Sequence, residues 1–314
     1  MNNLKTIIIF LLFVLLLFGC KKSNVTEPDY LDQATIEIMI QASEEMMNFD
    51  ENYDDGEPTY FTMGKTLGDL YPIKIGRKVT RVERNFNKVI VGDSAKVEVI
   101  TKYTGNLIIV GKLTPITPGD TTIRPDTIIT KPFIETIKRN FTFIHTNDKN
   151  NKHNGWKLQA ISLPEGSNEV KNVVIKKTEL IIPDRDTIII TDPLNTYFFM
   201  DDPQGKDIPT CKKGEDVILR VFLTSNSSKD DFVTITYGKR IGGQTLRVKR
   251  RLNLISSVQN GDNWDKIYEG QFNIFVMHPY GKFHSVINAV TNETVFTTDE
   301  PVSSNTWGIP YKVN

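Results

Sequence analysis

The chain of 314 residues carries 38 basic and 38 acidic side chains, so its formal net charge at pH 7 is zero. This balance provides no field that would attract nucleic acid, and it argues against a nucleic-acid partner. Hydrophobic residues make up 39% of the chain and include 17 phenylalanines and 10 tyrosines, which excludes an intrinsically disordered protein.

A short apolar segment begins the chain. Lys5 precedes an apolar run from residue 6 to residue 18, and the run closes on Leu17-Phe18-Gly19-Cys20. A membrane span needs roughly twenty apolar residues, so this segment is typical of a secretory signal. Its last four residues resemble the lipobox of bacterial lipoproteins, in which the cysteine is lipidated and the signal is removed before it. The alternative is an ordinary signal peptide in which Cys20 has no role.

The lipoprotein resemblance implies a bacterial cell-envelope protein that is held to a membrane by lipid at Cys20. Residues 1–19 would be the signal peptide, and the polar residues 20–29 would be a tether. Lys21 and Lys22 follow the cysteine, where an aspartate would resemble the inner-membrane retention signal of enterobacteria. Their presence favours the outer membrane, on either its periplasmic or its surface face.

One amphipathic helix is predicted from Leu31 to Phe49, with Asp29 as its N-cap. Its apolar stripe consists of Leu31, Ile38, Met39, Ala42, Met46 and Phe49. Downstream the pattern alternates, which predicts strands. A hairpin is expected about the turn Gly92-Asp93-Ser94, between strands at 84–91 and 95–103. The segment Lys112–Pro132 has no core pattern and is interpreted as a long loop.

Further strand patterns occur at Phe133–Phe143 and at Trp156–Ala160. A helix followed by antiparallel strands, the last with a tryptophan near its start, resembles NTF2-like or cystatin-like domains between Tyr30 and Leu163. The resemblance implies a helix in the cup of a curved sheet, and we assign residues 30–165 to this α+β domain. The Asp–His pair that an NTF2-like enzyme would place in the cup is missing.

Residues 166–314 are predicted to form a β-sandwich domain, beyond a turn-rich polar gap at Pro164–Asn168. Strand patterns follow without a helical pattern, among them Thr196–Met200, Leu246–Leu254, Tyr268–Met277 and Thr294–Phe296. Asn305–Tyr311 is expected to be an edge strand, because it contains a proline. Lys213–Val221 resembles the start of the second strand of immunoglobulin-like modules, although the Cys…Trp…Cys pattern is missing. The expected fold class is therefore mainly β, an α+β domain followed by an immunoglobulin-like β-sandwich.

Candidate metal ligands are few. Asp50–Glu57 has oxygens at alternate positions, as in a calcium loop, but it lacks the glycine and the glutamate of an EF-hand, so a solvated acidic turn is favoured. Of the four histidines, His278 and His284 flank a turn, and a zinc site there would need a third ligand that the sequence does not identify. We therefore assign no metal site, no cofactor and no catalytic residue, since motifs for nucleophiles and phosphate binding are also missing.

A row of cations is the densest charged feature of the second half. Alternation places Arg247, Lys249 and Arg251 on one face of a strand, where they would hold an anionic ligand or, as we favour, contact solvent. With Cys20 lipidated, Cys211 has no disulfide partner, and we expect a buried or loop thiol without reactivity.

Four short segments resemble the O-glycosylation sequon of Bacteroidota periplasmic and surface proteins, in which an acid precedes a hydroxyl and a small or apolar residue. They begin at Asp93, Asp120, Asp126 and Asp186. Chance occurrence in a chain rich in threonine and isoleucine is the alternative, so no site is assigned.

The predicted function is binding or scaffolding in the envelope, without an evident catalytic site. The alternative is an enzyme or small-ligand binder that uses the concave face of the N-terminal domain. Trp264 and Trp307 lie beside loop signals, where an aromatic face can contact a glycan or an envelope protein. The alternative for each tryptophan, which we favour, is that it closes one end of the sandwich core.

Overall fold

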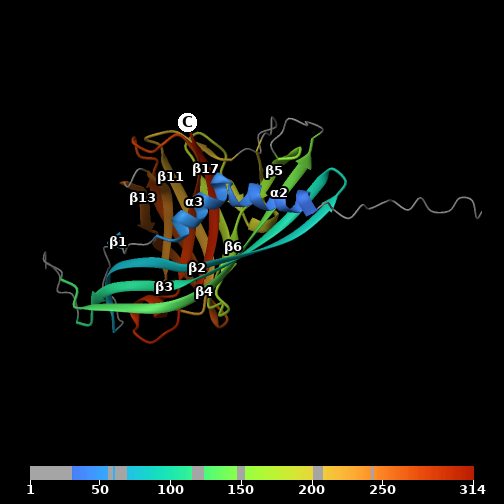
Figure 1. Cartoon of the computed structure of the whole chain (residues 1–314). Coiled ribbons are helices and arrows are strands. Elements are labelled where there is room, and N and C mark those ends of the chain that lie inside the picture. The colour runs from blue at the N-terminus through green and yellow to red at the C-terminus, as the bar shows by residue number, and fades with distance from the viewer. Residues whose placement is uncertain are drawn as a thin grey trace, which may run out of the picture.

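The computed structural model describes residues 30–55, 59–60, 69–114, 124–146, 153–200, 208–241 and 244–314. This part of the chain is mainly β, with short helices lying against a curled antiparallel sheet (Figure 1). None of its helices is both long and apolar enough to cross a membrane. The lipobox with Cys20, the tether and the predicted N-cap Asp29 lie outside the described residues.

The helical elements are α2 (Tyr30–Gln41), α3 (Glu44–Tyr53), α4 (Asn292–Phe296) and the 3-10 turn η1 (Pro193–Asn195). The strands of the first half are β1 (Thr59–Tyr60), β2 (Tyr71–Val91), β3 (Ser94–Lys112), β4 (Thr127–His145), β5 (Trp156–Ser162), β6 (Glu165–Ser167), β7 (Val173–Ile181), β8 (Ile188–Ile190) and β9 (Tyr197–Phe199). Those of the second half are β10 (Thr210–Cys211), β11 (Asp216–Ser225), β12 (Phe232–Ile241), β13 (Gln244–Arg251), β14 (Asn253–Asn260), β15 (Asn263–Asn273), β16 (Gly281–Val290) and β17 (Ser304–Val313).

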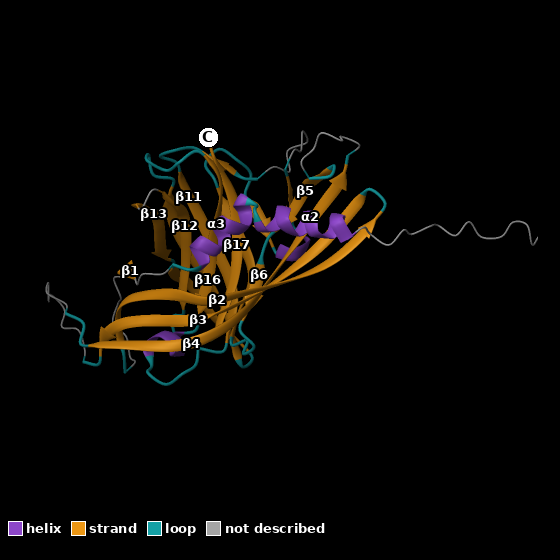
Figure 2. Cartoon of the chain, in the orientation of Figure 1, coloured by secondary structure: helices purple, strands orange, loops and turns teal. Residues whose placement is uncertain are grey.

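These strands form two sheets (Figure 2). The first sheet has 12 strands in the order β1-β2-β3-β4-β6-β17-β16-β12-β13, with β5, β9 and β10 attached beside this path. The second sheet has five strands in the order β14-β15-β11-β7-β8. One hydrophobic core draws on both sheets, for example on Leu219 of the second and on Ile287 and Trp307 of the first. The second sheet therefore covers one face of the β12–β16–β17 part of the first.

The predicted hairpin about Gly92 is confirmed, and its strands are much longer than expected. Strand β2 has 21 residues and β3 has 19, and the turn between them uses Gly92 at φ 56°. Strict alternation places Ala95, Val97 and Val99 on the buried face of β3, as predicted. Helices α2 and α3 lie along this concave face (Figure 1). The long loop predicted at 112–132 is shorter, because β4 already begins at Thr127.

The single predicted helix at 31–49 is wrong, because the structure has two helices. The chain leaves α2 after Gln41, and Ser43 caps α3 by accepting a hydrogen bond at its Oγ from the backbone N–H of Met46 at 3.3 Å. The break shifts the phase of the buried face. In α2 that face contains Ile36 and Ile40, whereas the predicted stripe residues Leu31 and Ile38 are exposed.

The polar gap predicted at 164–168 contains a strand, which corrects the prediction of a loop there. Strand β6 pairs antiparallel with β4 on one side and with β17 on the other. The first sheet therefore runs without interruption from the long strands into the second half of the chain. A second core cluster spans the same junction, with Tyr53 and Tyr103 packed against Val286 and Val290 of β16. Whether residues 30–165 and 166–314 fold independently stays a prediction.

Several strand predictions of the second half need correction. Residues 294–296 belong to helix α4, so a helix does interrupt the strands. Leu246–Leu254 is divided between β13 of the first sheet and β14 of the second, with Leu252 buried where the chain crosses from one to the other. The strand predicted at Thr196–Met200 is present as β9, but it pairs with β5 and so belongs to the first sheet.

The predicted edge strand at Asn305–Tyr311 is wrong, because β17 lies inside the first sheet. It pairs along its length with β16, and its other side pairs with β6 at residues 305–307 and with β10 at residues 312–313. Pro310 lies between these two short partners. The missing N–H of the proline is therefore tolerated inside the sheet, at a gap in the ladder on one side of β17.

Candidate binding cleft

Strand β4 carries charged side chains on its buried face. Lys131, Glu135 and Arg139 occupy alternate inward positions together with Phe133 and Ile137, and all five are buried. A buried charge is strongly unfavourable unless it is paired and hydrogen-bonded, so each of these charges must have partners. Sequence reasoning used only the apolar members of this row. The pattern that it missed is a charged residue at every fourth position, on the same face of the strand as the buried residues Phe133 and Ile137.

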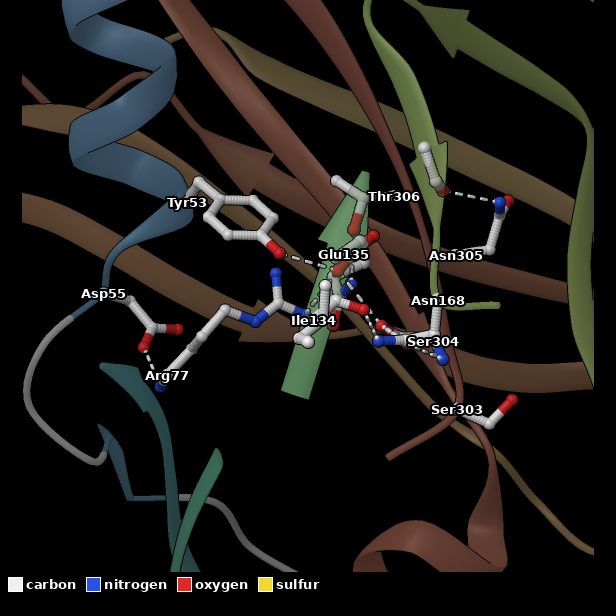
Figure 3. A network of polar contacts seen from close by, with 12 residues as sticks. Tyr53, Asp55, Arg77, Ile134, Glu135, Asn168, Ser303, Ser304, Asn305 and Thr306 are labelled. Atoms are coloured by element: carbon white, nitrogen blue, oxygen red, sulfur yellow. Dashed lines mark hydrogen bonds and ion pairs between the residues drawn. The ribbon is translucent and has the colours of Figure 1, made fainter. Parts of the chain in front are cut away.

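Glu135 is the centre of a buried network (Figure 3). Its Oε2 accepts hydrogen bonds from the hydroxyl of Tyr53 at 2.7 Å and from Oγ of Ser304 at 3.1 Å. The guanidinium of Arg77 lies 3.7 Å from the same oxygen and stacks on the ring of Tyr53, 4.3 Å from its centroid. Burial raises the pKa of Tyr53 well above its usual value, so the phenol stays protonated and donates. Among the described residues, Oε1 of Glu135 finds no hydrogen-bond partner.

Fixed partners also bind the two cations of β4. Nζ of Lys131 donates to the carbonyl oxygens of Thr294, Thr297 and Glu300 at 2.7, 2.8 and 2.7 Å, around the end of α4. Burial lowers the pKa of Lys131, while these carbonyls hold its ammonium.

Arg139 donates from Nε to the carbonyl oxygen of Ser162 at 3.0 Å and lies 3.0 Å from Nε2 of His284. His284 belongs to β16, so Arg139 joins β4 to the β16 region of the same sheet. The charges of β4 therefore connect the long strands to elements from the second half of the chain.

The acidic segment that was predicted to be a solvated turn is instead an intramolecular contact. Asp55 is buried, accepts from the backbone N–H of Arg77 and pairs with Lys249. Arg247 donates to the carbonyl oxygens of Glu51 and Asp54 at 2.6 and 2.8 Å, where it caps the C-terminus of α3. Glu57 lies outside the described residues.

The predicted cationic face on β13 therefore exists, but the expectation that it contacts solvent is wrong. Arg247 and Lys249 hold the end of α3, and Arg251 pairs with Asp230 at 2.7 Å. A small pocket of about 10 Å³ lies beside this contact, lined among others by Asn52 and Lys249. That volume holds about one water molecule, so it cannot serve as a substrate pocket.

The two histidines that flank the turn lie in separate surroundings. Nε2 of His278 is 2.9 Å from the hydroxyl of Tyr311, and His284 packs edge-on against Phe49. Burial lowers the pKa of both imidazoles, so both are neutral at physiological pH. Nowhere in the described ranges do three or more His, Cys, Asp or Glu side chains gather as metal ligands. Cys211 is buried as expected, and burial raises the pKa of its thiol to about 12, which makes it unreactive.

An open cleft of about 600 Å³ lies between the first sheet and strand β7 of the second. Its lining comes from β3, β4, β6, β7, β17 and the turn η1: Lys102, Ile134, Thr136, Lys138, Glu165, Gly166, Ser167, Asn168, Glu169, Lys171, Val174, Ile175, Leu194, Asn305 and Trp307. Lysines from β3, from β4 and from the segment before β7 converge on it. The pKa of Glu165 is raised by burial and by Asp192, against the opposing charges of Lys171 and Lys138.

Two asparagines hold the cleft in shape and connect it to the Glu135 network (Figure 3). Oδ1 of Asn168 accepts from the backbone N–H and from Oγ of Ser304, at 2.7 and 2.6 Å. Asn305 accepts at Oδ1 from the N–H of Ile175 at 2.9 Å and donates to the carbonyl of Gly166 at 2.7 Å. A Cβ at Gly166 would lie 2.4 Å from the carbonyl oxygen of Thr136, so only glycine fits there. The polar lining is thus held by bonds made within the fold.

The structure does not bring the two predicted tryptophans together. Trp307 lies in β17, is 4% exposed and lines both the core between the two sheets and the cleft, whereas half-buried Trp264 lies in β15 of the second sheet. A ligand contact at either one stays a prediction. Of the possible glycosylation positions, Ser94 and Thr187 are exposed, and the motif at Asp120 lies outside the described residues.

Sequence reasoning did not find the cleft, because neighbouring elements far apart in the chain create it. Its lining draws on residues from 102 to 307, and β6, which forms part of it, has only 3 residues. Comparison with known proteins finds no protein family whose model matches this chain and no curated protein that matches it.

Proposed function

We propose that the protein is a lipid-anchored binding protein of the bacterial cell envelope, attached through Cys20, and that the cleft holds its ligand or partner. The cleft is the observation that carries this proposal. Its volume of about 600 Å³ is in the range of ligand sites, about 300–1,000 Å³. Its lysine, glutamate and asparagine side chains offer both charge and hydrogen bonds, and its shape is held by Asn168 and Asn305.

Binding is favoured over catalysis for two reasons. The concave face of the long strands, where an enzyme pocket was the alternative, is covered by α2 and α3 through Ile36, Ile40, Met46 and Phe49. The buried titratable groups of β4 are each bound to partners within the fold. A catalytic site requires such groups to converge on space that a substrate can enter.

We extend the proposal to the fold. The order β14-β15-β11-β7 in one sheet and β13-β12-β16-β17 in the other corresponds to the D-E-B-A and C′-C-F-G order of immunoglobulin-like sandwiches. This order supports an immunoglobulin-like second half. Helices followed by β2, β3, β4 and β5, paired in that order, support a relationship of the first half to cystatin-like or NTF2-like domains.

A photo-crosslinking amino acid in the native envelope tests the binding site. Ile134 lines the cleft and is exposed, and Val89 is exposed on the outer face of the same sheet but outside the cleft. Benzoylphenylalanine at position 134 should give a discrete crosslinked product that is missing with the same group at position 89. Equal products at both positions, or none at 134, would overturn the assignment of the cleft.

The anchor is tested separately. Cys20→Ala should release the protein from membranes into a soluble fraction or leave the precursor unprocessed. A variant that matures normally and stays in the detergent phase would show that Cys20 does not carry the lipid.

A further inference from the structure

The loop between β15 and β16, residues 274–280, presents apolar side chains to solvent. Val276, Met277 and Tyr280 are 74%, 75% and 69% exposed, the three highest values for large hydrophobic residues in the described part of the chain. Single exposed apolar residues are common on protein surfaces, but three strongly exposed apolar residues within five positions form a patch.

The local backbone does not explain these residues. The N–H of His278 donates to the carbonyl of Phe275 at 2.8 Å, which closes a turn with Val276 and Met277 at its two central positions. Such positions are usually Gly, Pro, Asn, Asp or Ser, because those residues favour the turn and are compatible with solvent. Valine and methionine contribute neither to the turn nor to the core here. Residues that depart from the usual preferences of a turn, without stabilising the fold, indicate a functional role.

Buried residues of the loop anchor it to the core. Ile274 and His278 are completely buried, and the imidazole of His278 packs edge-on against Phe283 at 4.5 Å between centroids. Nε2 of the same ring lies 2.9 Å from the hydroxyl of Tyr311 in β17. The apolar tip is therefore fixed in its outward position before any partner arrives, which lowers the entropy lost on binding.

Positive charge lies beside the tip. Nζ of Lys213 sits 3.6 Å from the centroid of the Tyr280 ring, and Lys212 is exposed next to it. The neighbouring acid Glu215 pairs with Arg185 at 3.5 Å and accepts from the backbone N–H of Lys212 at 2.8 Å. An apolar tip with a tyrosine and a lysine at its rim matches the chemistry of a bilayer surface, which has acyl chains below and anionic headgroups above.

We propose that this loop docks onto an anionic phospholipid surface, with Val276 and Met277 among the acyl chains and with Tyr280 and Lys213 at the headgroups. The inference rests on the proposed anchor at Cys20. Because only nine residues lie between that cysteine and Tyr30, ten residue-to-residue steps, the lipid would keep Tyr30 within about 36 Å of the bilayer. Tethering raises the effective concentration of the surface, so a small apolar tip suffices for docking.

The test uses the full lipidated chain in vesicles of equal parts phosphatidylcholine and phosphatidylglycerol. Met277→Cys receives the environment-sensitive dye NBD, and Val258→Cys, 62% exposed near the opposite end of β15, is the matched control. Cys211 is buried and does not compete for the dye. Interfacial apolar side chains sit about 5–10 Å into the headgroup boundary, so a nitroxide on the acyl chain should lower emission about twofold at 277 and leave 258 unchanged.

Flotation of the vesicles separates the two proposals. If the protein floats but the emission of both dyes is that of NBD in water and is not quenched, the docking proposal is overturned and the anchor stands. Protein that does not float overturns the anchor and the docking that rests on it. A blue shift at 277 that needs added envelope proteins and resists the lipid quencher assigns the loop to a protein partner and overturns the membrane proposal.

Discussion

The hydroxyl of Tyr53 donates a 2.7 Å hydrogen bond to the carboxylate of Glu135, and both side chains are completely buried. Tyr53 is the last residue of α3, and Glu135 lies at the middle of the long strand β4. Through Ser304, the same carboxylate contacts the start of β17. A single acid therefore holds together a helix, a strand of the first half and the last strand of the chain.

Tyr53→Phe should lower the free energy of unfolding by about 1–3 kcal/mol, because a buried carboxylate loses a donor while the ring stays in place. Urea denaturation of the two proteins measures the difference. Tyr280→Phe, which removes an exposed hydroxyl, is the control and should change the stability by less than about 0.5 kcal/mol. Equal effects of the two substitutions would contradict the role assigned to Glu135.

Lys266 and Asp231 form an ion pair of 2.8 Å without exposure to solvent on either side. Lys266→Met should lower the free energy of unfolding by about 3–5 kcal/mol, because it leaves a buried carboxylate without its cation. The exposed pair of Arg81 and Glu83, at 2.7 Å, provides the comparison, and Arg81→Met should cost no more than about 1 kcal/mol. If both lysine and arginine variants unfold at the same urea concentration, burial does not set the strength of these pairs.

Stability should fall in mild acid because of His284. Burial, together with the charge of Arg139, holds the pKa of this imidazole well below its usual value of 6.5. The unfolded chain then takes up a proton first, so the stability is complete above pH 6.5 and is lost as the pH falls below it, by about 1.4 kcal/mol per pH unit for each such histidine. His284→Gln should reduce this slope in urea titrations at several pH values. A slope that stays the same in the variant would show that His284 does not titrate on unfolding.

Trp264 and Trp307 should contribute differently to the stability of the protein. Trp307→Ala should lower the free energy of unfolding by about 3–5 kcal/mol, because the side chain fills core between the sheets. Trp264→Ala should lower the free energy of unfolding by less, because Trp264 is only half-buried. Thermal melts of both variants measure this, and binding to envelope proteins shows whether Trp264 contacts a partner. Strong destabilisation by both substitutions would exclude an aromatic binding site at either position.

Local patterns predicted the parts of the fold that local chemistry determines. The hairpin about Gly92 and the buried face of β3 were correct, because a turn signal and strict alternation both lie within a few residues. Trp156 and Phe141 were also placed correctly in strands. The α2–α3 break was missed, since Ser43 caps a helix in a stretch whose apolar spacing continues across it.

The candidate site could not be predicted in the same way. The buried charges Lys131, Glu135 and Arg139 have partners 58 or more residues away, apart from the carbonyl of Ser162, and no local pattern identifies a partner at that separation. Pro310 indicated an edge strand because its missing N–H is usually tolerated only there. It is tolerated inside the sheet because β6 and β10 each pair with a different end of β17.

The position of β17 determines when the strands of the first sheet can join. Its residues 304–313 follow every other described strand in the sequence, yet they lie between β16 and β6, the strand that joins β17 to β4. The strand pairing of the first sheet is continuous from the long strands into β16 and β12 only when this ten-residue strand has paired on both sides. The two parts of this sheet therefore cannot join by strand pairing before β17 is in place, however early the long strands form.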